Sequence, residues 1–137
     1  MRTILVGYDD SEAAGRALER AATLAKALGA ALVVTSVAPV TETTGGRSLG
    51  ADPVAPASEH LAELREARAY LDGQGLTAAF VEAVGHESEG LLAAAQAHDA
   101  DLIVVGAAES SLVQRLLGHS VPDTVAHRAR CDVLIVR

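Results

Sequence analysis

The chain has 137 residues, 50% of them hydrophobic, which suits one domain with a substantial apolar core and argues against a second domain. Eighteen acidic and eleven basic residues give a formal net charge of −7, and the bases form no run, so binding to nucleic acid or to an anionic membrane surface is disfavoured. Cys131 is the only cysteine, which excludes an intrachain disulfide and a cysteine-rich metal site.

The first residues, Met1 to Thr3, lead directly into a strand-like segment without the apolar stretch of a signal peptide. The apolar runs are also much shorter than the roughly 20 residues of a membrane-spanning helix. The sequence therefore predicts a cytoplasmic protein without a membrane association.

The first half of the chain is predicted to form a strand, a helix, a strand and a loop. A β-branched run is followed by polar residues, which predicts a buried strand and a helix start capped by Asp10 or Ser11. Apolar residues then recur at spacings of three and four, which predicts an amphipathic helix closed by Gly29. The expected segments are Thr3–Tyr8 (strand), Glu12–Leu28 (helix), Ala31–Val37 (strand) and Thr41–Pro56 (mobile loop).

The second half continues the alternation with three helices and three strands. Helices are expected from Ser58 to Gly73 or Gly75, over Glu87–His98 and over Ser120–Ala129, and strands over Thr77–Val84, Asp101–Gly106 and Asp132–Arg137. Continuous apolar strands that alternate with helices favour a parallel sheet covered on both faces, a doubly wound α/β fold. In that fold ligands bind at the carboxyl ends of the strands where the winding reverses, here near Asp9–Ser11 and Gly106–Ser120.

The segment after the fourth strand is typical of a phosphate site. An apolar strand ends on Gly106, and a helix capped by Ser120 begins after an irregular loop. Glycine lets a backbone approach a phosphate closely, and a helix start offers free N–H donors.

Three blocks of the chain resemble the universal stress protein family: Ile4-Leu5-Val6-Gly7-Tyr8-Asp9 with Ser11, then His98-Asp99-Ala100-Asp101-Leu102-Ile103-Val104-Val105-Gly106, and Ser120-Val121 … Val125-Ala126-His127 … Cys131-Asp132-Val133-Leu134-Ile135-Val136. The resemblance implies one domain over residues 1–137, a five-stranded sheet of order 3-2-1-4-5 (Rossmann-like), and a homodimer formed through the last strand. It also implies a small stress-response binding or regulatory module rather than an enzyme.

The resemblance further implies an adenine-nucleotide crevice. By the family pattern, Asp9 would meet the adenosine part and the Val37 backbone would contact adenine. The full set of implied binding residues is Asp9, Val37, Gly106, Gly118, Ser120 and Val121.

The crevice departs from the ATP-binding branch of the family, whose loop reads glycine, two residues, glycine, nine residues, glycine and then serine or threonine. Glu109 and His119 occupy the second and third glycine positions, and Asp10 replaces the glycine of an Asp-Gly-Ser motif. Two like charges about 4 Å apart repel by about 4 kcal/mol at a surface-like dielectric before screening. We therefore expect a degenerate site that prefers a ligand with less phosphate charge than ATP.

Several alternatives stay open at this point. Gly118, one place early, would restore ATP binding, with or without slow hydrolysis, if the loop shifts its register. Asp10, Glu109 and His119 together offer ligands for a divalent cation, although their spacing matches no known motif. A response-regulator receiver domain is disfavoured because the third strand ends in Glu82 and Gly85, without the required aspartate.

No catalytic residue and no metal ligand is assigned. The chain holds no nucleophile elbow and no Walker loop, and Cys131 begins an apolar strand as a small hydrophobic residue would. The run Val133–Val136 would be an aggregation risk at a sheet edge unless it is paired, which supports the implied homodimer.

Overall fold

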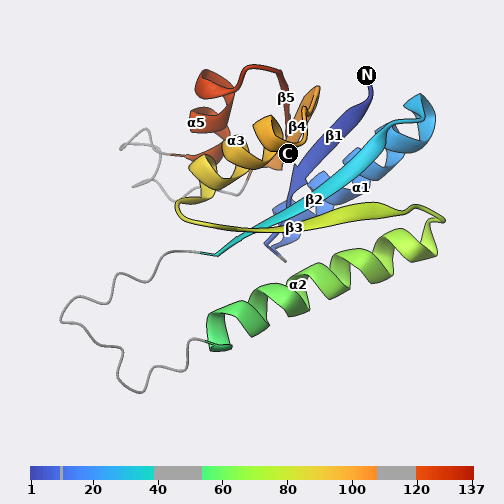
Figure 1. The fold of residues 1–137 in the computed structure, drawn as a ribbon. Coiled ribbons are helices and arrows are strands. Elements are labelled where there is room, and N and C mark those ends of the chain that lie inside the picture. Colours follow the sequence, from blue (N-terminus) through green and yellow to red (C-terminus); the bar gives the residue numbers. More distant parts are fainter. Residues whose placement is uncertain (10, 39–53, 108–119) are drawn as a thin grey trace.

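The computed structural model describes residues 1–9, 11–38, 54–107 and 120–137, with the side chains of 54–60 left aside. Its elements are β1 (Thr3–Gly7), α1 (Glu12–Leu28), β2 (Ala31–Ala38), α2 (Val54–Gly73), β3 (Ala78–Val84), α3 (Glu87–Ala97), β4 (Leu102–Gly106), α5 (Val121–Arg128) and β5 (Asp132–Val136). The strands form one parallel sheet of order β3-β2-β1-β4-β5, which confirms the predicted fold (Figure 1).

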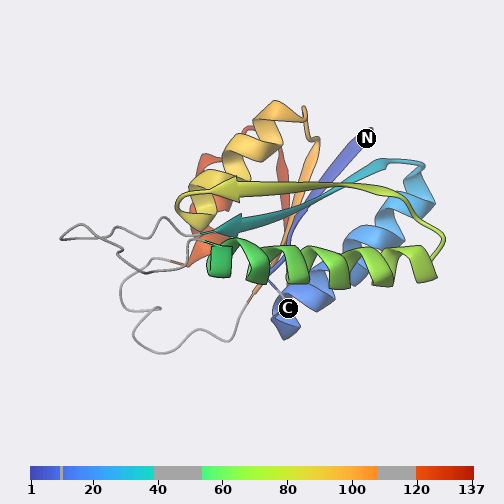
Figure 2. The same cartoon turned by 60° about the horizontal axis from the view of Figure 1, so that its bottom comes forward.

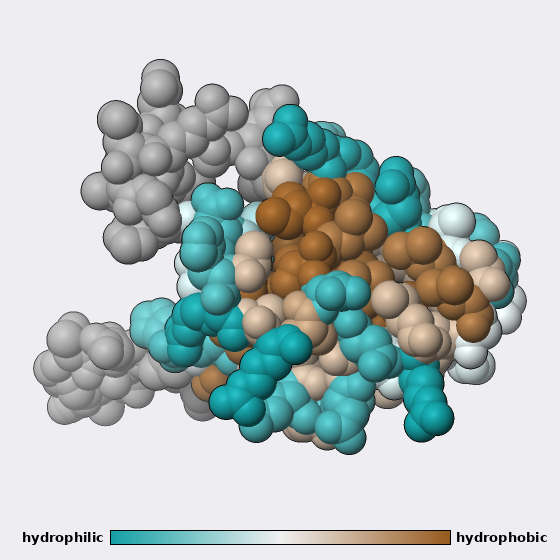
Figure 3. All heavy atoms as spheres, turned by 90° about the horizontal axis from the view of Figure 1, so that it is seen from above, coloured by the Kyte–Doolittle hydropathy of each residue, from teal (hydrophilic) through white to brown (hydrophobic). Residues whose placement is uncertain are grey.

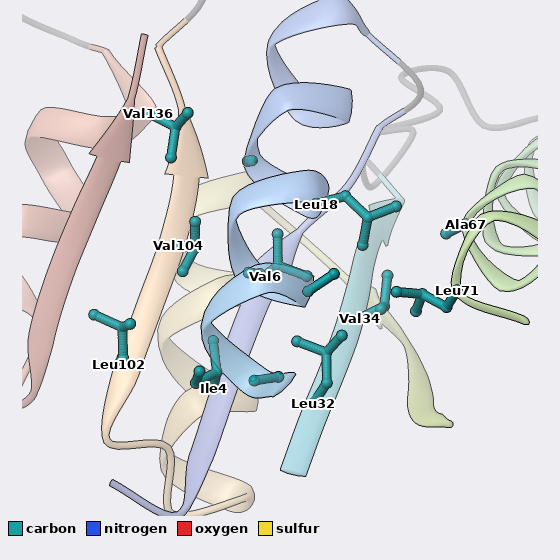
Figure 4. Close-up of a cluster of buried hydrophobic side chains, with 14 of the residues drawn as sticks. Ile4, Val6, Leu18, Leu32, Val34, Ala67, Leu71, Leu102, Val104 and Val136 are labelled. Atoms are coloured by element: carbon teal, nitrogen blue, oxygen red, sulfur yellow. The ribbon is translucent and has the colours of Figure 1, made fainter. Parts of the chain in front are cut away.

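Helices cover both faces of the sheet (Figure 2). Residues of α1 and α2 pack on one face around Ile4 and Val6 of β1, and residues of α3 and α5 pack on the other face around Leu5. Figure 4 shows the first of these clusters, in which Leu18 of α1 and Leu71 of α2 meet the side chains of the central strands. Successive residues of a strand point to opposite faces, so the continuous apolar run of β1 supplies both clusters.

The prediction for the start of α2 was wrong. The helix begins at Val54 rather than Ser58, so the end of the loop predicted over Thr41–Pro56 is helical. Pro56 is compatible with this because N–H groups of a first helical turn have no intrahelical acceptor, and proline loses nothing there. Residues 41–53 of that predicted loop lie outside the described residues.

The ends of α1 follow the predicted chemistry. Ser11, one of the two predicted caps, accepts a hydrogen bond from the Ala14 N–H at 3.1 Å through its Oγ. Gly29 ends the helix in the left-handed conformation, with φ of 64°, and donates its N–H to the Ala25 carbonyl. These caps fix the point at which the chain leaves β1 and enters the helix.

No helix within the described ranges is long and apolar enough to cross a bilayer.

Asp101 ties the starts of β1 and β4 together, although it lies at the surface. Its Oδ2 accepts hydrogen bonds from the N–H groups of Arg2 and Thr3 at 2.7 and 2.9 Å. These bonds, first that of Thr3 and then that of Arg2, hold the pKa of the Asp101 carboxyl below its ordinary value. A carboxyl with a lowered pKa in the folded state stabilises the fold above its unfolded-state pKa, and this contribution is lost as the pH falls through the folded-state pKa.

We therefore expect Asp101→Asn to lower the thermal midpoint at neutral pH. The difference from the unsubstituted protein should shrink as the pH falls below about 4, the ordinary pKa of the carboxyl, toward its lowered pKa in the folded state. Thermal unfolding followed by circular dichroism across this pH range measures both effects. A constant difference at every pH would show that the charge of Asp101 contributes nothing.

Candidate functional site

The carboxyl ends of β1 and β4 lie side by side, because Ile4, Leu5 and Val6 pair with Leu102, Ile103 and Val104. Asp9 follows β1 and is exposed, and its Oδ1 accepts a hydrogen bond from the Ser11 N–H at 3.0 Å. This turn orders the entry into α1. The sheet order therefore places Asp9 beside Gly106 at the point where the winding reverses, as predicted.

The other predicted residues divide into two groups. Val37 lies half-buried near the end of β2, Ser120 caps α5 by accepting from the Asp123 N–H at 3.2 Å, and Val121 is the first residue of that helix. Gly118, together with Asp10, Glu109 and His119, lies outside the described residues. The described part of the candidate site is thus the ends of β1, β2 and β4 and the start of α5.

Gly106 has a packing role that the sequence did not reveal. A Cβ at this position would lie 2.2 Å from the Ala13 carbonyl oxygen and 2.5 Å from its carbon. Real Cβ atoms do not approach a backbone so closely, so only glycine lets the first turn of α1 lie on the end of β4. The glycine is required whether or not a phosphate approaches it.

The N-terminal half of α3 packs as closely on the ends of β1 and β2. A Cβ at Gly90 would lie 2.8 Å from Cγ1 of Val37, and a Cβ at Gly7 would lie 3.0 Å from Cδ2 of Leu91. Two glycines therefore bring α3 against the sheet beside Asp9. The start of α3 is a wall of the candidate crevice that the sequence analysis missed.

The sequence analysis also missed the Glu87 carboxylate, on which Asp9 and Glu63 both act. Crowding of the Glu87 carboxyl by protein atoms raises its pKa, and the charges of Asp9 and Glu63 raise it further, although the residue as a whole is exposed. Glu63 of α2 accepts a hydrogen bond from the buried Ser36 Oγ at 3.0 Å, which directs it to the end of β2. Acidic residues are common in a first helical turn, so Glu87 carries no sequence signal of this proximity.

Two hollows of the described surface lie away from Asp9. One, of about 810 Å³, is lined by residues near the amino ends of the strands, including Thr3, Ala31 and Thr77. Another of about 590 Å³ lies between α3 and the segment that follows α5. The candidate crevice is defined by the sheet topology and by the polar residues at the strand ends.

The described residues form no group of three or more side chains suited to a metal ion. The predicted cation ligands Asp10, Glu109 and His119 lie outside them, so that hypothesis stays a prediction. Cys131 is half-buried and packs against the α3–α5 side of the core. Burial first, then Asp132 and Asp101, raises the pKa of its thiol, which fits a small hydrophobic residue better than a reactive one.

Comparison with known proteins decides the family. The model of the universal stress protein family matches residues 1–137. The chain belongs to this family. A curated universal stress protein of Mycobacterium tuberculosis is 36% identical over 145 residues, covering 98% of this chain and 95% of that protein.

Solved structures agree with this assignment. A universal stress protein in complex with cAMP is 33% identical, with a TM-score of 0.81, and the match covers 99% of this chain and 97% of that one. A family member from Burkholderia pseudomallei is 31% identical, with a TM-score of 0.78 and coverage of 98% and 94%. The family and the fold predicted from the sequence are confirmed.

Proposed function

We propose that this universal stress protein is a binding module rather than an enzyme, and that its crevice holds an adenine nucleotide with little phosphate charge. The crevice is the edge formed by Asp9, Val37, Gly106, Ser120 and Val121. The solved relative that carries cAMP supports an adenine nucleotide as the ligand class. The carboxyl ends of β1 and β4 are also where doubly wound folds bind such ligands.

The acidic residues that the sequence places in the predicted phosphate loops favour a ligand with a low phosphate charge. Asp10 and Glu109 stand where the ATP-binding branch has glycine. Each carboxylate near a phosphate chain opposes binding, and a cyclic monophosphate carries one negative charge where ATP carries several.

Calorimetric titration of the nucleotide-stripped protein tests this proposal. We expect cAMP or AMP to bind at least about tenfold more tightly than ATP, since about 1.4 kcal/mol of repulsion suffices for that ratio. The double variant Glu109→Gly, His119→Gly should raise the ATP affinity if these departures cause the preference. ATP binding as tight as cAMP binding in the unsubstituted protein would contradict the proposal.

The second candidate is a genuine ATP-binding module that uses Gly118 in a shifted loop. The intact start of α5 favours it, because Ser120 caps the helix and its N-terminus offers the positive end of the helix dipole. The same titration separates the two candidates, and Gly118→Ala should weaken ATP binding only under the second.

We also propose that the protein is a homodimer joined through β5. This strand pairs with β4 on one side and forms an edge of the sheet. Ile135 is 37% exposed, and Val133 and Leu134 are half-buried. Figure 3 views the molecule from the β5 edge, where apolar side chains gather between hydrophilic ones. A second copy that pairs with this edge would cover them.

A further inference from the structure

Glu87 lies beside Asp9 because of the way α3 packs on the sheet. Leu91 lies against Gly7. Glu87 precedes Leu91 by one helical turn, about 5.4 Å, and Asp9 follows Gly7, the last residue of β1, by two residues. Since α3 begins at the carboxyl ends of the strands (Figure 1), the first turn of α3, which holds Glu87, lies at the same end of the sheet as the segment that holds Asp9. This placement depends on backbone packing alone.

The surroundings of Glu87 are mainly acidic. The strand side chains nearest to the start of α3, Val37 and Ala83, are apolar. Burial is the largest cause of the raised pKa of the Glu87 carboxyl, and the negative charges of Asp9 and Glu63 raise it further. The elements around it carry further charged or titratable groups: His86 and Glu89 at the start of α3, Arg65 and Glu66 beside Glu63 on α2, and Asp123, His127 and Arg128 on α5. A ligand that brings hydrogen-bond donors would relieve the repulsion among these carboxylates.

Thr35 carries an unpartnered buried hydroxyl on the same side of the sheet. Its Oγ1 is fully buried and has no hydrogen-bond partner among the described residues. Thr35 pairs with Gly7 in the sheet, two residues before Asp9. Its side chain lies on the α3-facing side of β2, as that of Val37 does. A buried hydroxyl without a partner destabilises the fold, and a polar molecule that reaches the end of β2 would offset this cost.

We propose that the Glu87 carboxylate faces the nucleoside part of the bound nucleotide and accepts a hydrogen bond from it. The inference rests on the proposed function above and adds a specificity-determining residue to that site. An ionised carboxylate only accepts hydrogen bonds, and the nucleoside part of an adenine nucleotide offers an exocyclic amino group and ribose hydroxyls as donors. Glu87 thus selects ligands that carry a donor at this position.

Calorimetric titration with cAMP compares Glu87→Gln with Glu89→Gln, a matched control that removes the same charge from the same helical turn. We expect Glu87→Gln to bind about tenfold more weakly, as befits a lost charge-assisted hydrogen bond, and Glu89→Gln to bind like the unsubstituted protein. 2′-Deoxy-cAMP and the cyclic phosphate of purine riboside, which lacks the amino group, identify the donor. Each analogue lacks one of the two candidate donors. The Glu87→Gln substitution should weaken the binding of the analogue that still has the donor bound by Glu87, and it should leave the binding of the other analogue unchanged.

The pH dependence supplies a readout that a merely structural role would not change. A protonated Glu87 is a poorer hydrogen-bond acceptor than an ionised one. The affinity for cAMP should therefore decrease as the pH is lowered through the pKa of this carboxyl, and the affinity of the Glu87→Gln variant should not change over that pH range. NMR titration of the Glu87 carboxyl carbon should show a lower pKa with cAMP bound than without it.

The outcomes separate the two proposals. If the protein binds cAMP and Glu87→Gln binds it equally or more tightly, the role of Glu87 is overturned while the nucleotide function stands. If the unsubstituted folded protein binds no adenine nucleotide, both proposals are wrong. Circular dichroism confirms that each variant is folded.

Discussion

Gly106→Ala is expected to destabilise the protein by about 3 kcal/mol or more, because the added methyl group collides with backbone rather than with a side chain that can move. The new Cβ would lie 2.2 Å from the Ala13 carbonyl oxygen. Either the first turn of α1 or the end of β4 must shift, and both border the candidate crevice. Equilibrium denaturant unfolding measures the loss.

Gly15→Ala is the matched control for this substitution. Gly15 lies inside α1, two residues from Ala13, and a Cβ there meets nothing within 4 Å. Alanine favours a helix interior over glycine, so this variant should gain about 0.5–1 kcal/mol. If the free energy of unfolding of Gly106→Ala lies within about 1 kcal/mol of that of the unsubstituted protein, α1 does not approach β4 as closely as described.

Ile135→Lys is expected to convert the proposed dimer to a monomer. Ile135 lies on the exposed edge strand, where each copy would bury it against the other, and a lysine there would place two ammonium groups inside the apolar interface. Sedimentation velocity at micromolar concentration distinguishes the two states. The monomer should stay folded, because the lysine head group can reach water at a position that is already 37% exposed.

Val84→Lys controls for the charge of the new side chain. Val84 is 70% exposed on β3, the opposite edge of the sheet, so its substitution should leave the dimer intact. A monomeric unsubstituted protein would refute the dimer itself. A dimeric Ile135→Lys variant would instead place the interface on another surface.

Sequence reasoning predicted the elements that border the candidate crevice where the signal is local in the chain. The apolar run before Gly106, the polar residues after β1 and the capping Ser120 each report their own backbone environment. Glu87 shows where such reasoning ends. It resembles any acidic residue in a first helical turn, and it nears Asp9 only because α3 packs on β1, far away in sequence.

The sequence by itself determined the alternation of strands and helices, the parallel sheet and, through the three matching blocks, the family. Those properties follow from hydrophobic periodicity and caps, which act over one or two turns of chain. The start of α2 was misplaced because Pro56 also fits a first helical turn. Only the tertiary structure showed that Gly106 must be glycine and that Glu87 lies near Asp9. Both depend on packing distances between elements that are far apart in the sequence.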